Sequence, residues 1–280
     1  MAWVPSRSDS IVCRDRNRED HQRGSFSDHN IFMLFAGSVC CRVILGSLNV
    51  CVLWANLVLW NVPRVPTRVS EALILRTFPL KESDLIVSFL SRDQGKLRGV
   101  AKRARRPKSP FGSGLERLSH VKVYYFQRET RELVNLDSCE LIHSQFSLAP
   151  DYAAGVALDL MSEVTEQLLP PAEPSERFFR LLIAVLDFLR AKGAEGLWQG
   201  ANYFLLWAVR LSGFLPELRV AAESMEIAEE MLYTPVARLT QRTWTRETAA
   251  DLRRLLVRSI EEHIERRLVT APLLETVPAP

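Results

Sequence analysis

Between residues 70 and 142, short apolar runs alternate with polar turns at the spacing of β-strands. The predicted strands lie in SEALILRTF (70–78), DLIVSFLSRDQG (84–95), KLRGVAKRA (96–104) and HVKVYYFQRETRELVNLDSCELI (120–142). The last segment holds two strands around a polar turn at 128–131, and Pro79 is expected to end the first strand. Five short strands separated by turn residues are typical of a small barrel, so we predict an OB-fold over 68–147.

From Pro150 onward, apolar residues recur at helical spacing, which predicts helices over 152–169, 175–191, 197–214 and 245–268. Ser175 is a suitable N-cap for the second, which is apolar almost all round and is expected to be the buried central helix. The last helix carries an apolar stripe, while its arginines are expected to face solvent: Arg253, Arg254, Arg258, Arg266 and Arg267. We therefore predict an α+β protein with an all-α domain at 148–275 and a disordered tail at 276–280.

The first 67 residues do not fit either pattern. Residues 1–30 are polar and without periodicity, so we expect them to be disordered, and residues 31–60 are mostly apolar with Arg42 as their only formal charge. We favour the interpretation that this extension comes from a translation start placed too far upstream. A membrane anchor and a buried helix remain as alternatives, because an apolar stretch of this length exceeds the roughly 20 residues that span a bilayer.

Composition narrows the classes of function for the rest of the chain. The 280 residues carry a net charge of only +3 and are 47% hydrophobic, so any affinity for a polyanion has to come from a local patch. The five cysteines, Cys13, Cys40, Cys41, Cys51 and Cys139, form no CxxC pair, which argues against a disulfide framework and favours a cytoplasmic protein. The chain has no GxGxxG, Walker, HExxH or GxSxG motif, and we predict a binding protein without a catalytic site.

A dense basic run follows the third predicted strand. Its seven cations have no acidic residue between them: Lys96, Arg98, Lys102, Arg103, Arg105, Arg106 and Lys108. Pro107 and Pro110 prevent the run from forming a helix, so we expect a loop that follows a phosphate backbone. A solvated surface and an anionic lipid site are the alternatives, and we consider membrane binding the less favoured of the two.

Three consecutive aromatic residues, Tyr124, Tyr125 and Phe126, lie in the fourth strand. Side chains alternate across a strand, so the three cannot all face one side. Tyr124 and Phe126 are candidates for stacking on bases, but a place in the barrel core is the favoured interpretation for one of them.

The segments EALILRTF, ESD, GKLRGVAKRAR, LERLSHV and REL, spread over residues 70–142, together resemble the N-terminal domain of the bacterial RecO family of DNA repair proteins. The resemblance implies an OB-fold followed by a helical domain, binding of single- and double-stranded DNA, and promotion of strand annealing. It also implies partnership with RecR and the single-stranded-DNA-binding protein in loading the recombinase RecA, and it places the natural start near residue 65–70. An adaptor with only weak DNA contact is the alternative.

Two details refine what the resemblance implies. A groove in the helical domain with basic rims is expected to accept the acidic tail of the single-stranded-DNA-binding protein, with Arg177, Arg180 and Arg210 as candidate rim residues. Some family members carry paired CxxC motifs after a GFLP turn, but here residues 217–244 contain neither cysteine nor histidine. We therefore expect no zinc site and no cofactor, and apolar contacts have to hold this segment.

Overall fold

The structure is a computed structural model that describes residues 67–127, 132–148 and 150–277. The alternatives for the N-terminal extension therefore lie outside the described residues, as does most of the predicted C-terminal tail. Val277, which belongs to that predicted tail, is buried with 2% of its surface exposed. Within the described residues, no helix is long and apolar enough to cross a membrane.

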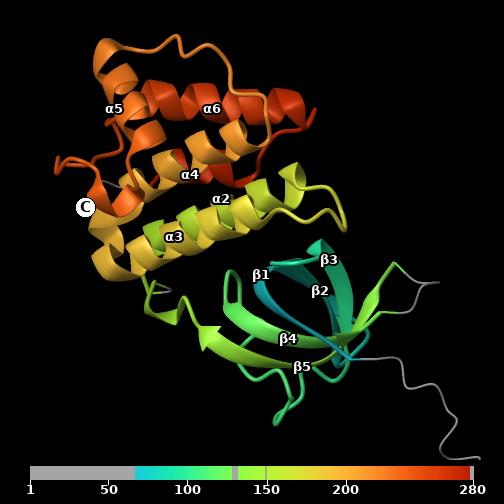
Figure 1. Ribbon diagram of the computed structural model, residues 1–280. Helices are drawn as coiled ribbons and strands as arrows, with labels where there is room; N and C mark the ends of the chain where they lie inside the picture. The colour runs from blue at the N-terminus through green and yellow to red at the C-terminus, as the bar shows by residue number, and fades with distance from the viewer. Residues whose placement is uncertain (1–66, 128–131, 149, 278–280) are drawn as a thin grey trace, which may run out of the picture. The chain divides into compact units, whose positions relative to one another are not determined.

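Five strands form a closed barrel, as the sequence pattern predicts (Figure 1). They are β1 (Arg68–Leu80), β2 (Asp84–Ser91), β3 (Gly95–Ala101), β4 (His120–Phe126) and β5 (Val134–His143). The order around the barrel is β1-β2-β3-β5-β4, with β3 and β5 parallel and the other pairs antiparallel. The strand continues two residues past its predicted end at Phe78, because Pro79 still pairs with Leu85 beside the β1–β2 turn, where a missing N–H disturbs the ladder little.

Strand β1 belongs to two hydrophobic cores at once. Ala72 and Ile74 point into the barrel, whereas Leu73 and Leu75 pack in the core formed with the helices. A strand buried on both faces reads as a continuous apolar run, which explains why residues 72–75 do not alternate. The pairing of β1 with β2 shifts register between Ile74 and Arg76, and the Leu75 carbonyl at this bulge accepts a hydrogen bond of 2.5 Å from the Ser162 hydroxyl.

The helical part follows the barrel in the chain and is visible in Figure 1. Its α-helices are α2 (Tyr152–Leu168), α3 (Glu176–Lys192), α4 (Leu197–Leu211), α5 (Ala222–Tyr233), α6 (Ala250–His263) and α7 (Thr270–Glu275). Single 3-10 turns lie at Phe146–Leu148, Gly193–Gly196 and Val236–Arg238. Asp151 caps α2 by accepting hydrogen bonds from the backbone of the first turn.

Two predictions about the second predicted helix, α3, need correction. Ser175 occupies the N-cap position of α3, but its side chain makes no capping hydrogen bond. Helix α3 is also not the central helix, since Arg177, Arg180 and Asp187 leave one of its faces exposed. The central position belongs to α4, which packs against α2, α3, α5 and α6 and is apolar on more of its circumference.

The last predicted helix, 245–268, is shorter than expected, because only α6 lies within it and α7 begins beyond its predicted end. The Thr248 hydroxyl accepts the Thr245 backbone N–H at 3.0 Å, and Ala249 adopts a left-handed φ of 53°, so α6 begins only at Ala250. Glu265 has a φ of 53° as well, and the chain turns before Leu268 enters the core. Local side-chain hydrogen bonds compete with the helix at its start, which periodicity alone does not reveal.

The prediction that Arg253 faces solvent is wrong. The side chain is 1% exposed and donates to both carboxylate oxygens of Glu275, at 2.7 and 3.2 Å. Its guanidinium also lies 4.6 Å from the centre of the Trp198 ring. The ion pair and the aromatic contact compensate for the cost of burying the Arg253 charge. The helical pattern of the sequence had assigned this residue to the polar, solvent-facing side of the helix.

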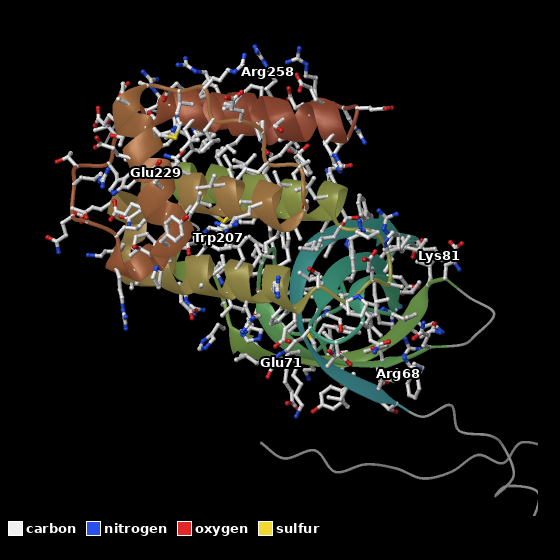
Figure 2. All side chains as sticks on the ribbon, turned by 45° about the horizontal axis from the view of Figure 1, so that its top comes forward. Arg68, Glu71, Lys81, Trp207, Glu229 and Arg258 are labelled. Atoms are coloured by element: carbon white, nitrogen blue, oxygen red, sulfur yellow. The ribbon has the colours of Figure 1, made fainter. Side chains whose placement is uncertain are left out.

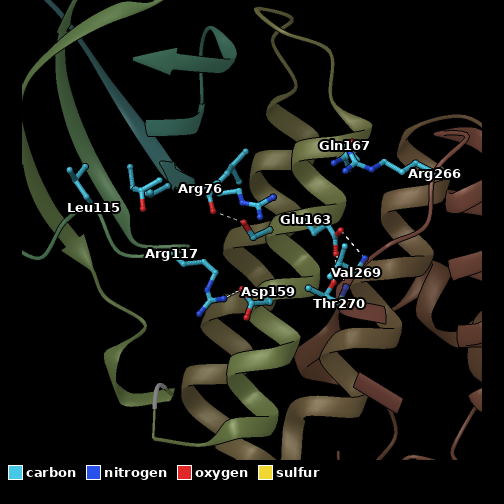
Figure 3. A pocket seen from close by; sticks show the side chains of 13 residues that line it. Arg76, Leu115, Arg117, Asp159, Glu163, Gln167, Arg266, Val269 and Thr270 are labelled. Carbon is cyan, nitrogen blue, oxygen red and sulfur yellow. Dashed lines mark hydrogen bonds and ion pairs between the residues drawn. The ribbon is translucent and has the colours of Figure 1, made fainter. Parts of the chain in front are cut away.

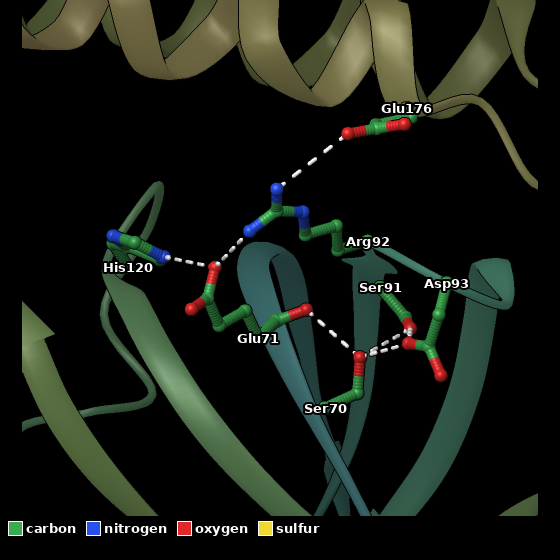
Figure 4. A network of polar contacts seen from close by, with 7 residues as sticks. All are labelled: Ser70, Glu71, Ser91, Arg92, Asp93, His120 and Glu176. Carbon is green, nitrogen blue, oxygen red and sulfur yellow. Dashed lines mark hydrogen bonds and ion pairs between the residues drawn. The ribbon is translucent and has the colours of Figure 1, made fainter.

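A polar network connects one end of the barrel to α3 (Figure 4). Arg92, in the turn after β2, bridges Glu71 of β1 at 3.1 Å and Glu176 of α3 at 3.5 Å. Nearby, Asp93 accepts hydrogen bonds from the hydroxyls of Ser70 and Ser91. Burial opposes the charge of Asp93, but these hydrogen bonds outweigh it and lower the pKa of Asp93.

Candidate nucleic-acid interface

The loop after β3, which we call the basic loop (residues 102–112), folds back onto the turn between β1 and β2. The Arg103 backbone N–H donates to Asp84 Oδ1 at 2.8 Å, and the Arg105 N–H donates to the Ser83 carbonyl at 3.0 Å. At the far end of the loop, Phe111 is 3% exposed in the barrel core and fixes the loop to the barrel. The backbone of the loop is therefore held at three points while its charged side chains remain outside.

Five cations of the basic loop are exposed: Lys102, Arg103, Arg105, Arg106 and Lys108. None of these side chains forms an ion pair within the part of the chain that the structure describes. Arg103 and Lys108 have left-handed φ values of 56° and 64°, so the loop is neither helix nor strand. A surface of uncompensated arginine and lysine suits phosphate groups.

Lys81 adds a cation that the sequence analysis missed. It lies in the turn between β1 and β2 onto which the basic loop folds, is exposed and projects away from the barrel (Figure 2). In the sequence, Lys81 is followed by Glu82 and Asp84, so the turn looks locally acidic. Asp84 accepts a hydrogen bond from the Arg103 backbone, and among the described residues Lys81 forms no ion pair with either acidic neighbour.

Lys96 and Arg98 are placed elsewhere, at the junction between the barrel and α2. Lys96 is 8% exposed, and its Nζ donates to the Glu166 carbonyl at 2.5 Å. Arg98 donates to Glu166 Oε1 at 2.7 Å, and Glu166 Oε2 accepts from the Ser88 hydroxyl. Burial lowers the pKa of Lys96, and the neighbouring Glu166 partly counters this effect. The structure thus separates these two residues from the exposed cations of the basic loop.

The aromatic residues of β4 alternate as strand geometry requires. Tyr125 fills the barrel and packs edge-on against Phe89, with ring centres 6.1 Å apart. Tyr124 and Phe126 lie on the outer side and are partly exposed, so the expectation that one of them fills the barrel core is wrong. The Tyr124 hydroxyl donates to Glu140 at 2.8 Å, so a carboxylate stands beside this ring. Their role in stacking on bases stays a prediction.

Phe78 is a second exposed aromatic residue on the barrel. It lies near the end of β1, is 37% exposed, and has the Arg76 guanidinium 5.3 Å from its ring centre. Phe111, by contrast, lies in the barrel core.

Comparison with known proteins gives matches to both halves of the described region. The family models described as "Recombination protein O N terminal" and "Recombination protein O C terminal" match residues 67–145 and 149–230. The DNA repair protein RecO of Koribacter versatilis is 39% identical over 240 residues, which cover 74% of this chain and 97% of that protein. The chain belongs to the RecO family. More distant are the RecO proteins of Cutibacterium acnes, 34% identical over 158 residues (55% of this chain, 64% of that protein), and of Thermodesulfovibrio yellowstonii, 30% identical over 169 residues (59% and 65%).

RecO membership assigns the protein to DNA repair and recombination. In the structure, the two glycines of the GKLRGVAK segment, on which the resemblance partly rests, have a packing role. Gly95 has a φ of +72°, and a Cβ there would lie 2.0 Å from the Glu173 carbonyl oxygen. A Cβ on Gly99 would lie 2.7 Å from Val134, where β3 and β5 pair in parallel. Gly99 allows the close approach that closes the barrel, whereas Gly95 allows the segment between α2 and α3 to lie against β3.

The three candidate partner-binding arginines of this RecO protein all lie on the surface of the helical part. Arg177 and Arg180 are on the first turns of α3, and Arg210 is near the end of α4. Arg210 lies over the Trp207 ring, with 4.9 Å between the guanidinium carbon and the ring centre. Because α3 and α4 are joined by a single 3-10 turn, the start of α3 and the end of α4 lie at the same end of the pair.

Proposed function

We propose that this protein binds single- and double-stranded DNA through the basic loop and promotes annealing of complementary strands. The observation that carries the proposal is the set of exposed, uncompensated cations on a loop whose backbone is fixed to the barrel. Binding of phosphates by these cations releases counterions, and neutralising two strands reduces their mutual repulsion. Membership of the RecO family supports this role.

Charge reversal of the loop tests the proposal. The variant Arg103→Glu/Arg105→Glu/Arg106→Glu is expected to weaken single-strand binding and to reduce the slope of log affinity against log salt by about 2, at about 0.7 for each phosphate that is no longer bound. The matched control reverses three exposed arginines of the helical part, Arg219, Arg238 and Arg254. Affinity is measured by fluorescence anisotropy over a salt series, and annealing by quenching of labelled complementary strands. Normal binding and annealing by the loop variant would refute the proposal.

We further propose that the protein acts with RecR to load RecA on strands coated by the single-stranded-DNA-binding protein. The exposed Arg177, Arg180 and Arg210 supply positive charge for an acidic protein tail. Reversing these three charges is expected to abolish capture of the single-stranded-DNA-binding protein and leave binding of naked DNA intact. RecA loading is read as ATP hydrolysis by RecA on coated strands with and without RecR.

The alternative function is an adaptor with only weak DNA contact. It predicts that the basic-loop variant loses neither capture of the single-stranded-DNA-binding protein nor RecA loading. Loss of RecA loading in that variant, with capture intact, therefore favours the DNA-binding mediator over the adaptor.

We also propose that the segment between α4 and α6 is stable without a metal ion. Ile227, Ala228 and Met231 of α5 are buried, and the Trp207 indole N–H donates to the Met231 carbonyl at 3.0 Å. Glu230 adds an ion pair to Arg242 across the segment. Chelation with EDTA is expected to leave the thermal unfolding midpoint unchanged, and a drop in the midpoint that zinc restores would refute this.

A further inference from the structure

A polar cleft of about 420 Å³ lies beside the bulge of β1, between the barrel and the helices. Its walls come from β1, from the segment before β4, from α2 and from the connection between α6 and α7 (Figure 3). None of the residues predicted from the sequence to bind DNA lines it. Its size is in the range of clefts that hold small ligands or single nucleotides.

Both carboxylates in the wall are already engaged. Asp159 forms an ion pair with Arg117, and Glu163 accepts the backbone N–H groups of Val269 and Thr270, each at 2.9 Å. Figure 3 shows these contacts as dashed lines along α2. The Asp159 charge is compensated by Arg117, whereas Glu163 is held in place by neutral backbone donors and keeps its negative charge.

Two other guanidinium groups reach the cleft without such compensation. Arg76 comes from β1 and Arg266 from the segment after α6, and neither forms an ion pair with any described residue. The Arg76 guanidinium lies over the Phe78 ring, and in Figure 3 Arg266 extends toward Gln167. The three arginines and two carboxylates of the lining leave the cleft with a formal charge of +1, and Gln167, Leu115 and Val269 add an amide and apolar surface to its walls.

The exposed end of β1 connects this cleft to the basic loop. Residues 76–79 are all exposed, and the strand then enters the turn onto which Arg103 and Arg105 fold. From Arg76 to Lys81 an extended chain covers about 17 Å, at about 3.3 Å per residue. This distance corresponds to about five nucleotides at the duplex spacing of about 3.4 Å along one strand.

We propose that the cleft is a second contact for a single DNA strand, which leaves the basic loop, passes Phe78 and enters between barrel and helices. Arg76 and Arg266 contact phosphates there, and Leu115 and Val269 offer apolar surface to a base. An arginine next to an exposed aromatic ring is the combination that single-strand-binding surfaces use, which favours DNA over an acidic peptide. This inference rests on the proposed DNA binding by the basic loop.

The test compares the full-length protein with three variants on labelled oligothymidylates of about 6 and about 24 nucleotides, lengths that fall below and above the combined site. The cleft variant is Arg76→Gln/Arg266→Gln, the control is Arg219→Gln/Arg238→Gln, and the loop variant is Arg103→Gln/Arg105→Gln/Arg106→Gln. For the long strand, the cleft variant is expected to reduce the salt slope by about 1.4, since two phosphates are no longer neutralised and each accounts for about 0.7. For the short strand, which the basic loop holds, the cleft variant and the control are expected to behave like the unmodified protein.

The outcomes separate this inference from the proposed function. If the cleft variant binds the long strand with unchanged slope while the loop variant loses affinity, the cleft contact is refuted and the proposed function stands. If the loop variant also binds both strands normally, the proposed function itself fails. Should the cleft variant fold poorly, iododeoxyuridine placed along the long strand and photo-crosslinked to the unmodified protein gives the answer, with crosslinks in residues 74–77 or 266–270 expected and their absence refuting the contact.

The alternative ligand of the cleft is an acidic peptide, and the cleft variant distinguishes between peptide and DNA. A labelled peptide rich in aspartate is titrated into the unmodified protein and the cleft variant. Loss of peptide binding in the cleft variant with unchanged binding of the long strand would overturn the DNA assignment. Loss of strand binding with no measurable peptide binding to the unmodified protein supports it.

Discussion

The carboxylate of Glu166 on α2 accepts a hydrogen bond of 2.7 Å from Arg98 on β3, with only 7% of the glutamate side chain exposed. The same residue accepts from Ser88 and, through its carbonyl, from Lys96. One residue of α2 thus accepts hydrogen bonds from three residues of the barrel. Lys96 and Arg98, two cations of the basic run, therefore hold the barrel to α2. Their alternation with Leu97 in the sequence does not predict this contact.

Replacement of this carboxylate is expected to loosen the junction. Glu166→Gln removes the charge that compensates Arg98 and Lys96, and we expect the free energy of unfolding to fall by about 1–3 kcal/mol. Urea denaturation followed by intrinsic fluorescence measures the change. Glu195→Gln, at an exposed position in the turn after α3, is the control and is expected to have little effect. An unchanged urea midpoint for Glu166→Gln would contradict the role we give to Glu166.

Arg253 offers a matched comparison with its exposed neighbour Arg254. Arg253→Met removes the donor to Glu275 and to the Arg246 carbonyl and the contact with Trp198, so we expect a loss of about 2–3 kcal/mol of stability. The loss stays below that of a fully buried pair, because the Glu275 side chain keeps 39% exposure and remains hydrated. Arg254→Met is expected to change stability by less than about 0.5 kcal/mol. Equal effects in thermal unfolding of the two variants would refute the distinction.

His120 makes stability dependent on pH at the barrel–helix joint. Its ring lies near Phe179, His143 and Glu71, and burial is the main cause that lowers the pKa of His120 in the folded protein, with Glu71 acting in the opposite direction. The unfolded chain therefore binds a proton more readily, so stability is lost as the pH falls below the ordinary histidine value of about 6.5.

The variant His120→Asn removes this contribution. Between about pH 7.5 and 5.5, its loss of unfolding free energy is expected to be smaller than that of the unmodified protein, because asparagine does not titrate. Urea unfolding at the two pH values gives both differences. His263→Asn, at an exposed position, serves as the control, and the hypothesis fails if the two variants show the same pH dependence as the unmodified protein.

Cys139 is expected to be chemically inert in the folded state. Burial raises the pKa of its thiol to about 11, and the thiol donates to the Phe111 carbonyl at 3.3 Å. A rise of two units from the reference value of 9.0 reduces the thiolate fraction near pH 8 about 100-fold, so alkylation by iodoacetamide slows by at least that factor relative to denatured protein. Mass spectrometry of the peptide that contains Cys139 follows the reaction. Alkylation at the same rate in native and denatured protein would show that the thiol is accessible.

The sequence was sufficient for the barrel and for most helices, because alternation and helical periodicity report directly on burial. It also showed that Tyr124, Tyr125 and Phe126 could not share one face. Periodicity failed where a polar residue lies in the core: Arg253 looked like a surface residue, since its partner Glu275 is 22 positions away in the chain. The same reason hid Glu166 as the partner of Lys96 and Arg98, and the local acidic context hid Lys81.

Because β1 contributes to both hydrophobic cores, the barrel and the helical part cannot be separated without exposing apolar side chains. A fragment that ends near residue 147 would leave Leu73, Leu75, Leu90 and Leu118 without the helices that cover them. Such a fragment would expose an apolar face and would tend to self-associate. If the barrel is exchanged between relatives, in evolution or by experiment, a compatible α2 has to be exchanged with it. The barrel and the helices are separate segments of the sequence, but they do not fold as independently stable units.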